Sequence, residues 1–167
     1  MFFRQPAMNK SRYPTTQAIR FLRAHQAVFK AHEYAYIPHG GTAQSAAALG
    51  VDEHAVIKTI VLQNELKQGL IVLMHGDKQI SVRQLARDLN MKHLEPAPPE
   101  QANKWTGFLV GGTSPFGIKT PLPIYAEAGI FDLPEIYING GKRGLLVAIS
   151  PDVLYILKPT KVQVAID

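Results

Sequence analysis

Apolar positions recur along the chain in short segments, and their spacing predicts a succession of helices and strands. The first helix is expected after Thr15 or Thr16, either of which can cap it through its hydroxyl. Its apolar face carries three residues, Ala18, Ile19 and Leu22. The helical pattern weakens near Gln26, and the segment Val28–Tyr34 that follows is typical of a strand.

The most apolar segments lie in the middle of the chain, and both are of strand length. An alanine-rich helix is predicted over Thr42–Leu49, with Gly50 as its C-terminal stop. Asp52 can then cap a short turn before Val56–Leu62, a run rich in β-branched residues that indicates a buried strand. A second buried strand is predicted over Leu70–His75, after a polar turn.

Three further helices and several strands are expected in the rest of the chain. The motif Ser81-x-x-Gln84 fits a capping box, and the helix that it opens should end near Asn90. The pair Pro98-Pro99 suits the first turn of another helix, which ends near Gly107. The last elements are strands over Ile136–Asn139, Leu145–Ile149 and Val162–Ile166, and a short helix from Ser150 through Leu157.

The order of these elements mixes helices and strands without a regular alternation. This order favours an α+β fold with a central mixed sheet over a doubly wound fold. Neither an internal repeat nor a long linker divides the chain, so we expect a single domain over residues 15–167. Residues 1–14 are expected to form a basic N-terminal extension that ends at Pro14.

Composition and charge narrow the possible functions. The chain has 167 residues and no cysteine, which excludes disulfides, thiolate metal ligands and a cysteine nucleophile. A formal net charge of +5 and a pI near 9.5 favour a polyanionic partner, although simple solubility is the alternative. No apolar run approaches the roughly 20 residues that span a bilayer, and the N-terminus lacks the apolar core of a signal peptide. We therefore expect a cytoplasmic protein without membrane contact.

Lys58 is the first candidate for a functional residue, because it stands inside the most apolar predicted strand. On an alternating strand its side chain shares a face with Ile60 and opposes Thr59, and both faces are otherwise apolar. A buried ammonium is costly unless an anionic group meets it, so Lys58 is expected to point into a cavity toward a partner. The alternative is a lysine at a strand end whose stem covers the core.

Two glycine-rich segments are the other candidates. In Phe108–Gly117 the glycines let the backbone approach a ligand, and successive amides can bind an oxyanion or a phosphate oxygen. This segment is neither a Walker loop nor a dinucleotide fingerprint. Gly140–Gly144 carries two cations, Lys142 and Arg143, which could receive a phosphate. The alternatives are an ordinary tight turn for the first segment and a solvated hairpin tip for the second.

The sequence gives no sign of a metal site or of a covalent nucleophile. Six histidines are present, but none has the spacing of a zinc motif, so no metal is expected. The stretch Gly112–Phe116 breaks the last position of a Gly-x-Ser-x-Gly elbow. Without a cysteine or such an elbow, catalysis through a covalent protein intermediate is not expected.

Taken in order, three of these segments resemble the YbaK family of bacterial Cys-tRNA(Pro) deacylases, which is related to the editing domain inserted in many prolyl-tRNA synthetases. They are the lysine strand Val56–Thr59, the glycine loop Leu109–Gly117 and the turn Asn139–Leu145, and they occur at the family's spacing. The resemblance covers roughly residues 15–165. It implies a mixed, partly barrel-like sheet surrounded by helices, and catalysis without a metal or another cofactor.

The resemblance also implies roles for individual residues. Lys58 would contact the terminal region of the tRNA, and Gly112 and Ser114 would orient the ester, so these three are the implied catalytic residues. Tyr34 would shape the pocket. The other implied substrate-binding residues are Gly111, Thr113, Pro115, Asn139, Gly140, Gly141, Lys142 and Arg143.

An aminoacyl ester is already activated, so oriented donors around its carbonyl could suffice for hydrolysis. In the cysteine-specific branch the substrate's own thiol is thought to attack the ester, and the pocket then has to hold that thiol and reject larger side chains. Two departures from the family pattern leave the amino acid open. Asn139 stands where the family often has serine, and Lys119–Pro123 is shorter and less basic than in the cysteine branch.

The sequence therefore predicts a trans-editing hydrolase that deacylates misacylated tRNA, with Cys-tRNA(Pro) as the first expected substrate. Prolyl-tRNA synthetase is the expected protein partner. The alternatives are editing of Ala-tRNA(Pro) or another small amino acid, a non-catalytic tRNA- or synthetase-binding module of the same fold, and a small-molecule hydrolase that uses no RNA.

Overall fold

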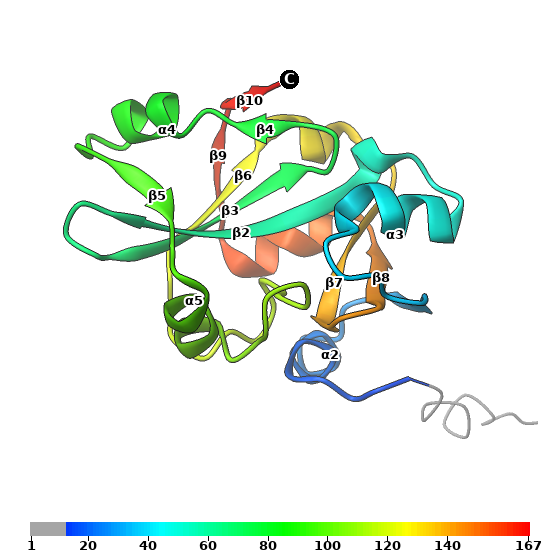
Figure 1. The fold of residues 1–167 in the computed structure, drawn as a ribbon. Helices are drawn as coiled ribbons and strands as arrows, with labels where there is room; N and C mark the ends of the chain where they lie inside the picture. The colour runs from blue at the N-terminus through cyan, green and yellow to red at the C-terminus, as the bar shows by residue number, and fades with distance from the viewer. Residues whose placement is uncertain (1–12) are drawn as a thin grey trace, which may run out of the picture.

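The computed structural model describes residues 13–167, and it is built on one large mixed sheet (Figure 1). The predicted N-terminal extension lies, apart from its last two residues, outside the described residues. The helices are α2 (Gln17–Ala24), α3 (Gly41–Leu49), α4 (Val82–Asp88) and α5 (Pro99–Thr106), and the 3-10 helices are η2 (Glu53–Ala55), η3 (Ala128–Asp132) and η4 (Pro151–Leu157). The strands are β1 (Lys30–Glu33), β2 (Val56–Asn64), β3 (Gly69–His75), β4 (Gln79–Ile80), β5 (Leu94–Pro96), β6 (Ile124–Glu127), β7 (Ile136–Lys142), β8 (Leu145–Ile149), β9 (Thr160–Val162) and β10 (Ala165–Ile166).

The large sheet has eight strands in the order β1-β8-β7-β2-β3-β6-β9, and β5 adds to β2 off this path. The pairs β2–β3 and β7–β8 are antiparallel, whereas β2–β7 and β3–β6 are parallel. The sheet is therefore mixed, and helices cover both of its faces. The expected α+β fold with a central mixed sheet is confirmed.

The alternation of β2 divides the core between the two faces of the sheet. Ile57 and Val61 point to one face, where they belong to the larger core cluster together with residues of α2, α5 and η4. Leu62 points to the other face and packs with Leu85 and Ala86 of α4. In Figure 1, α4 lies above β2, and α2 and α5 lie below it. Lys58 is four residues before Leu62 on the same strand, so its side chain points to the same face as Leu62, the face that α4 covers.

Most of the expected helix ends are confirmed by their capping contacts. Thr16, not Thr15, caps α2, because its hydroxyl accepts from the amide of Ile19 at 3.0 Å. Gly50 and Gly107 end α3 and α5 in the left-handed conformation. Only half of the capping box at α4 forms: the Ser81 hydroxyl accepts from the Gln84 amide, while the Gln84 side chain contacts neighbours on its own helix.

The strand predictions need three corrections, each with a physical reason. β1 is shorter than Val28–Tyr34 because Val28 is 85% exposed and only Lys30–Glu33 pair with β8. The predicted strand Val162–Ile166 is split between β9 and β10, because the amide of Val164 donates to the Glu127 carboxylate instead of to a strand. Three short strands were not predicted: β4 and β5, which have only two and three residues, and β6, whose short buried run follows prolines.

Candidate active site

A cavity of about 570 Å³ lies along β2 and brings together segments that are far apart in the sequence. Its floor is formed by Val56–Val61 of β2. Its walls come from the segment after β1, from the first turns of α3, from the loop after α5 and from the β7–β8 hairpin. This is the place where the lysine strand and both glycine-rich segments meet.

Half of the predicted site residues line this cavity. They are Tyr34, Lys58, Gly111, Thr113, Asn139 and Arg143. The other half is placed behind or beside it: Gly112, Ser114, Pro115, Gly140, Gly141 and Lys142. Ser114 is fully buried, and its hydroxyl accepts from the amide of Phe116 at 3.2 Å, so this side chain shapes the loop from inside.

The two glycine-rich segments are bound directly to each other. The Asn139 carboxamide oxygen accepts from the amides of Gly141 and Lys142, at 2.6 and 3.1 Å, which folds the hairpin tip around it. The same side chain donates to the carbonyl of Gly111 at 3.2 Å. Arg143 Nε donates to the carbonyl of Val110 at 2.9 Å. The hairpin thus holds the glycine loop at the mouth of the cavity.

Close packing explains why glycine occupies two adjacent positions of this loop. Gly111 has a φ of +91°, and a Cβ there would lie 2.6 Å from the Tyr36 hydroxyl. A Cβ on Gly112 would lie 2.8 Å from the backbone nitrogen of Arg143. A side chain at Gly112 would separate the loop from the hairpin, because backbone atoms cannot yield by rotating away, and one at Gly111 would require the Tyr36 side chain or the loop to move.

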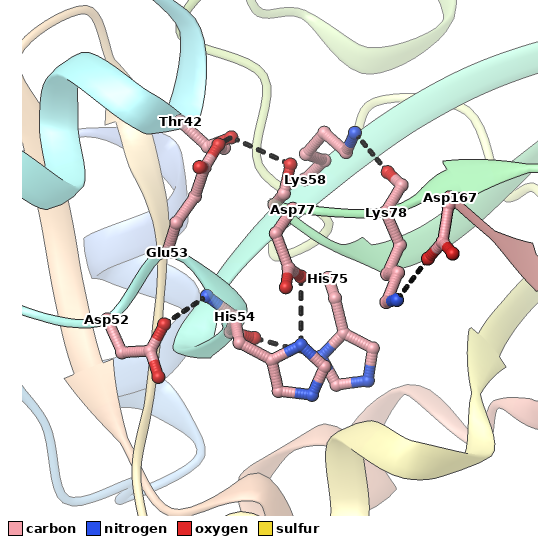
Figure 2. A network of polar contacts seen from close by, with 10 residues as sticks. Thr42, Asp52, Glu53, His54, Lys58, His75, Asp77, Lys78 and Asp167 are labelled. Carbon is pink, nitrogen blue, oxygen red and sulfur yellow. Dashed lines mark hydrogen bonds and ion pairs between the residues drawn. The ribbon is translucent and has the colours of Figure 1, made fainter.

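Lys58 lies half-buried on the cavity floor, and its ammonium donates to the carbonyl oxygen of Lys78 at 2.5 Å (Figure 2). Burial lowers the pKa of Lys58, and the nearby carboxylates of Glu53 and Asp77 partly offset this effect. The direct partner of Lys58 is therefore a backbone carbonyl rather than an anionic group, although two carboxylates lie close by. Lys58 is the third residue of its strand, so it is not the strand-end lysine of the alternative interpretation.

The carbonyl of Lys78 that accepts from Lys58 lies in a turn, and a polar network that the sequence did not predict fixes this turn (Figure 2). Asp77 contacts Nδ1 of His54 at 2.8 Å, and the His54 ring stacks on His75 with centroids 3.8 Å apart. Burial of Asp77 would raise its pKa, but its hydrogen bond and charge contact with His54 outweigh this and lower it. Lys78 pairs with Asp167. These polar residues lie in turns and at strand ends, so no periodic pattern marks them.

Thr59 occupies an open stretch of strand edge on the cavity floor. β2 pairs with β7 only at Val56 and Ile57, and with β5 only at Leu62–Asn64. The carbonyl of Val61 points to this edge, where it accepts from the amide of Ala97, so the backbone of Thr59, two residues away, points there too. The buried Thr59 hydroxyl has no hydrogen-bond partner within residues 13–167.

Tyr34 contributes a phenol to the wall opposite Lys58's strand. Burial raises the pKa of Tyr34, so the hydroxyl is protonated at neutral pH and can donate as well as accept. Its own amide donates to the carbonyl of Gly144 at 2.9 Å, which ties the segment after β1 to the hairpin. The cavity therefore offers a phenol, an ammonium and a guanidinium around an uncharged backbone loop.

Among residues 13–167 no group of three or more histidine, cysteine, aspartate or glutamate side chains is placed to hold a metal ion. None of the helices in this part of the chain is long and apolar enough to cross a membrane.

Comparison with known proteins decides the family. The sequence model of the aminoacyl-tRNA editing domain matches residues 38–155, which contain the lysine strand and both glycine-rich segments. The chain belongs to this family. The resemblance seen in the sequence is thereby confirmed.

Individual relatives agree with this assignment. An Enterococcus faecalis protein with the provisional name Cys-tRNA(Pro)/Cys-tRNA(Cys) deacylase EbsC is 26% identical over 83% of this chain and 85% of its own length. The proline–tRNA ligase of Streptococcus equi subsp. zooepidemicus is 31% identical over 64% of this chain, but over only 17% of the ligase. A crystal structure described provisionally as a trans-editing enzyme for prolyl tRNA synthetase superposes with a TM-score of 0.79, at 24% identity, over 90% of this chain and 96% of that one.

Proposed function

We propose that this editing domain is a trans-editing hydrolase that removes a wrongly attached amino acid from tRNA, and that its substrate is Cys-tRNA(Pro). The observation that supports this most directly is the convergence of Lys58, Tyr34 and the Gly111 loop on one cavity. The name of the Enterococcus faecalis relative points to the same reaction and the same amino acid.

The cavity suits an ester that is hydrolysed by positioning. The chain has no cysteine, and the hydroxyl of Ser114 is buried and engaged inside its own loop. A protein nucleophile is therefore not part of the proposal. Lys58 would bind the ribose or phosphate of the terminal adenosine, and the Gly111 loop would hold the ester carbonyl against backbone donors. Donors fixed before the reaction stabilise the developing oxyanion without reorganisation, which is worth about 2.7–4 kcal/mol per donor in well-studied hydrolases.

A cysteinyl substrate supplies the nucleophile that the cavity lacks. Its thiol loses a proton and attacks the carbonyl carbon, and the bond to the ribose oxygen breaks as that oxygen takes a proton. Water then opens the released thioester. The pocket has to hold the thiol close to the carbonyl, and proximity of this kind can contribute several kcal/mol to the barrier reduction.

Partner and location follow as parts of the same proposal. The match to one segment of a proline–tRNA ligase makes prolyl-tRNA synthetase the proposed partner, since that enzyme would supply misacylated tRNA(Pro). The formal charge of +5 supports weak, sequence-independent attraction to the tRNA. A cytoplasmic location is proposed because both aminoacylation and its correction take place there.

The test is deacylation of four substrates: Cys-tRNA(Pro), Ala-tRNA(Pro), Pro-tRNA(Pro) and Cys-tRNA(Cys). Release of cysteine but not of proline is the expected result. Release of alanine alone would replace cysteine by alanine as the edited residue. No release from any substrate would reject the enzymatic proposal in favour of a non-catalytic module of the same fold. A flat salt dependence of substrate binding would instead favour a small-molecule hydrolase.

A further inference from the structure

A second cavity, of about 500 Å³, lies between α4 and β5, outside the candidate active site. Its lining is basic and apolar and contains no carboxylate. The basic residues are Arg83, Arg87, Lys92 and His93, and the apolar ones are Val82, Ala86, Met91 and Leu94. We call Arg83, Arg87 and Lys92 the α4 basic surface.

The three cations of this surface are not held in ion pairs within the described part of the chain. No salt bridge joins any of them to a carboxylate of residues 13–167. Arg87 donates to the uncharged Gln84 side chain at 2.8 Å. All three side chains are exposed, and they therefore present positive charge to the solvent.

The carboxylates nearest to this surface are already engaged by other groups. Glu65, close to Lys92, accepts from the backbone amides of Lys92 and His93. Asp88 accepts from the Gln84 side chain at 2.7 Å. Glu95 contacts His93 and accepts from the side chain of Gln63. None of these three carboxylates forms an ion pair with Arg83, Arg87 or Lys92, so the basic side chains can turn to a ligand that carries negative charge.

The α4 basic surface lies on the same face of the sheet as Lys58. Ile60, two residues after Lys58, packs in the core cluster that contains Leu85 of α4. Leu94, in the lining of the second cavity, pairs with Asn64 near the end of β2. Since a strand rises about 3.3 Å per residue, Lys58 and this end of β2 are about 20 Å apart. β2 therefore connects the candidate active site to the basic cavity.

We propose that the α4 basic surface binds the phosphate backbone of the tRNA acceptor arm while the aminoacylated 3′ end occupies the cavity at Lys58. This inference rests on the proposed function, because it takes the position of the 3′ end from it. A separation of about 20 Å corresponds to about six stacked nucleotides, since stacked bases are spaced about 3.4 Å apart along one strand. The helical arm that follows the unpaired 3′ end would then meet α4.

The spacing of the arginines suits a polyphosphate backbone better than a single small anion. Arg83 and Arg87 are four residues apart on α4, so their Cβ atoms are about 5–6 Å apart on one side of the helix. Two guanidinium groups at this spacing can each engage a different phosphate. Arginine also binds phosphate oxygens through two parallel hydrogen bonds, which fixes the orientation of the backbone.

The experiment compares two double variants of the full chain. Arg83→Gln/Arg87→Gln removes two charges from the α4 basic surface. Arg20→Gln/Arg23→Gln is the matched control, because it removes two exposed arginines from α2, on the opposite face of the sheet (Figure 1). Affinity for uncharged tRNA(Pro) is measured by filter binding over a series of salt concentrations, and deacylation of Cys-tRNA(Pro) is measured in parallel.

The α4 variant is expected to bind tRNA about tenfold more weakly, with a log–log salt slope reduced by about 1–2, because each lost phosphate contact releases about one counterion fewer. Its KM should rise with little change in kcat, while the α2 variant stays close to the parent chain. Equal losses in both variants, or none in the α4 variant, would overturn the inference. Displacement of the tRNA by inorganic phosphate at low concentration would also overturn the inference, because it would indicate a site for a small anion.

These outcomes separate the inference from the proposed function. If the parent chain deacylates no aminoacyl-tRNA but the α4 variant alone loses tRNA affinity, the enzymatic proposal fails and the RNA-binding surface stands. If the parent chain deacylates Cys-tRNA(Pro) and the α4 variant matches it in affinity, salt slope and KM, the enzymatic proposal stands and the surface does not.

Discussion

The ammonium of Lys58 donates a 2.5 Å hydrogen bond to the carbonyl oxygen of Lys78, which lies in the turn after β3. This contact orients a charged side chain on an apolar strand without neutralising its charge, because the acceptor is a peptide carbonyl. Glu53 and Asp77 lie close enough to oppose the effect of burial on its pKa. Under the proposed function, this ammonium is the group that would meet a phosphate or ribose oxygen in the cavity.

Replacing Lys58 by alanine should lower kcat/KM for Cys-tRNA(Pro) by about 10²–10³, the range found when a fixed electrostatic donor is removed from an active site. The fold should persist, since the change also removes the cost of burying an ammonium. Single-turnover deacylation and thermal unfolding would be measured together. Lys67→Ala, at an exposed turn between β2 and β3, is the control. Undiminished turnover in Lys58→Ala would remove this residue from the mechanism.

Asp77→Asn should shift the alkaline limb of the pH–activity profile to lower pH. Asp77 raises the pKa of Lys58, so removing its charge lowers that pKa further, and the ammonium is lost earlier as the pH rises. The measurement is kcat/KM against pH, corrected for spontaneous hydrolysis of the ester. Asp132→Asn, an exposed residue at the end of η3, should leave the limb in place. A profile for Asp77→Asn that coincides with the parent's would show that the charge of Lys58 does not govern this limb.

Thr59→Val should stabilise the fold by about 1 kcal/mol, because it removes a buried hydroxyl that has no partner among residues 13–167. Thr106→Val should instead destabilise the fold. The buried Thr106 hydroxyl donates to the Ala102 carbonyl at 2.8 Å and accepts from the Phe108 amide, so its loss leaves a buried amide unpaired. Urea unfolding of both variants provides the comparison. If both substitutions changed the free energy of unfolding in the same direction, this account of Thr59 would be contradicted.

Gly111→Ala should reduce both stability and deacylation, and Gly50→Ala should reduce stability alone. Both glycines have a positive φ, so alanine at either costs about 1–2 kcal/mol in backbone conformation. Only at Gly111 does the new methyl meet another group, the Tyr36 hydroxyl, and displace the loop from the cavity. Thermal unfolding and kcat/KM would be compared at equal folded fraction. Full activity in folded Gly111→Ala would show that the loop position is not critical.

Much of the local structure could be predicted from neighbouring residues. The caps at Thr16 and Asp52 and the stops at Gly50 and Gly107 depend on one or two adjacent positions, and each forms as expected. The family could also be predicted, because three short segments keep their order and spacing along the chain. The missed strand β6 shows the limit of such patterns, since its four residues form a strand through pairing with β3 and β9.

The sequence by itself determined the α+β class, the family, and the presence of Lys58 and Gly111 in the segments that line the cavity. Only the tertiary structure decided which groups meet there. It bound Asn139 to the glycine loop, turned Ser114 inward and placed Lys58 against a carbonyl from a later turn. The reason is physical: caps and strand periodicity arise between residues close in sequence, whereas these contacts depend on the mixed pairing of β2 with β3, β5 and β7.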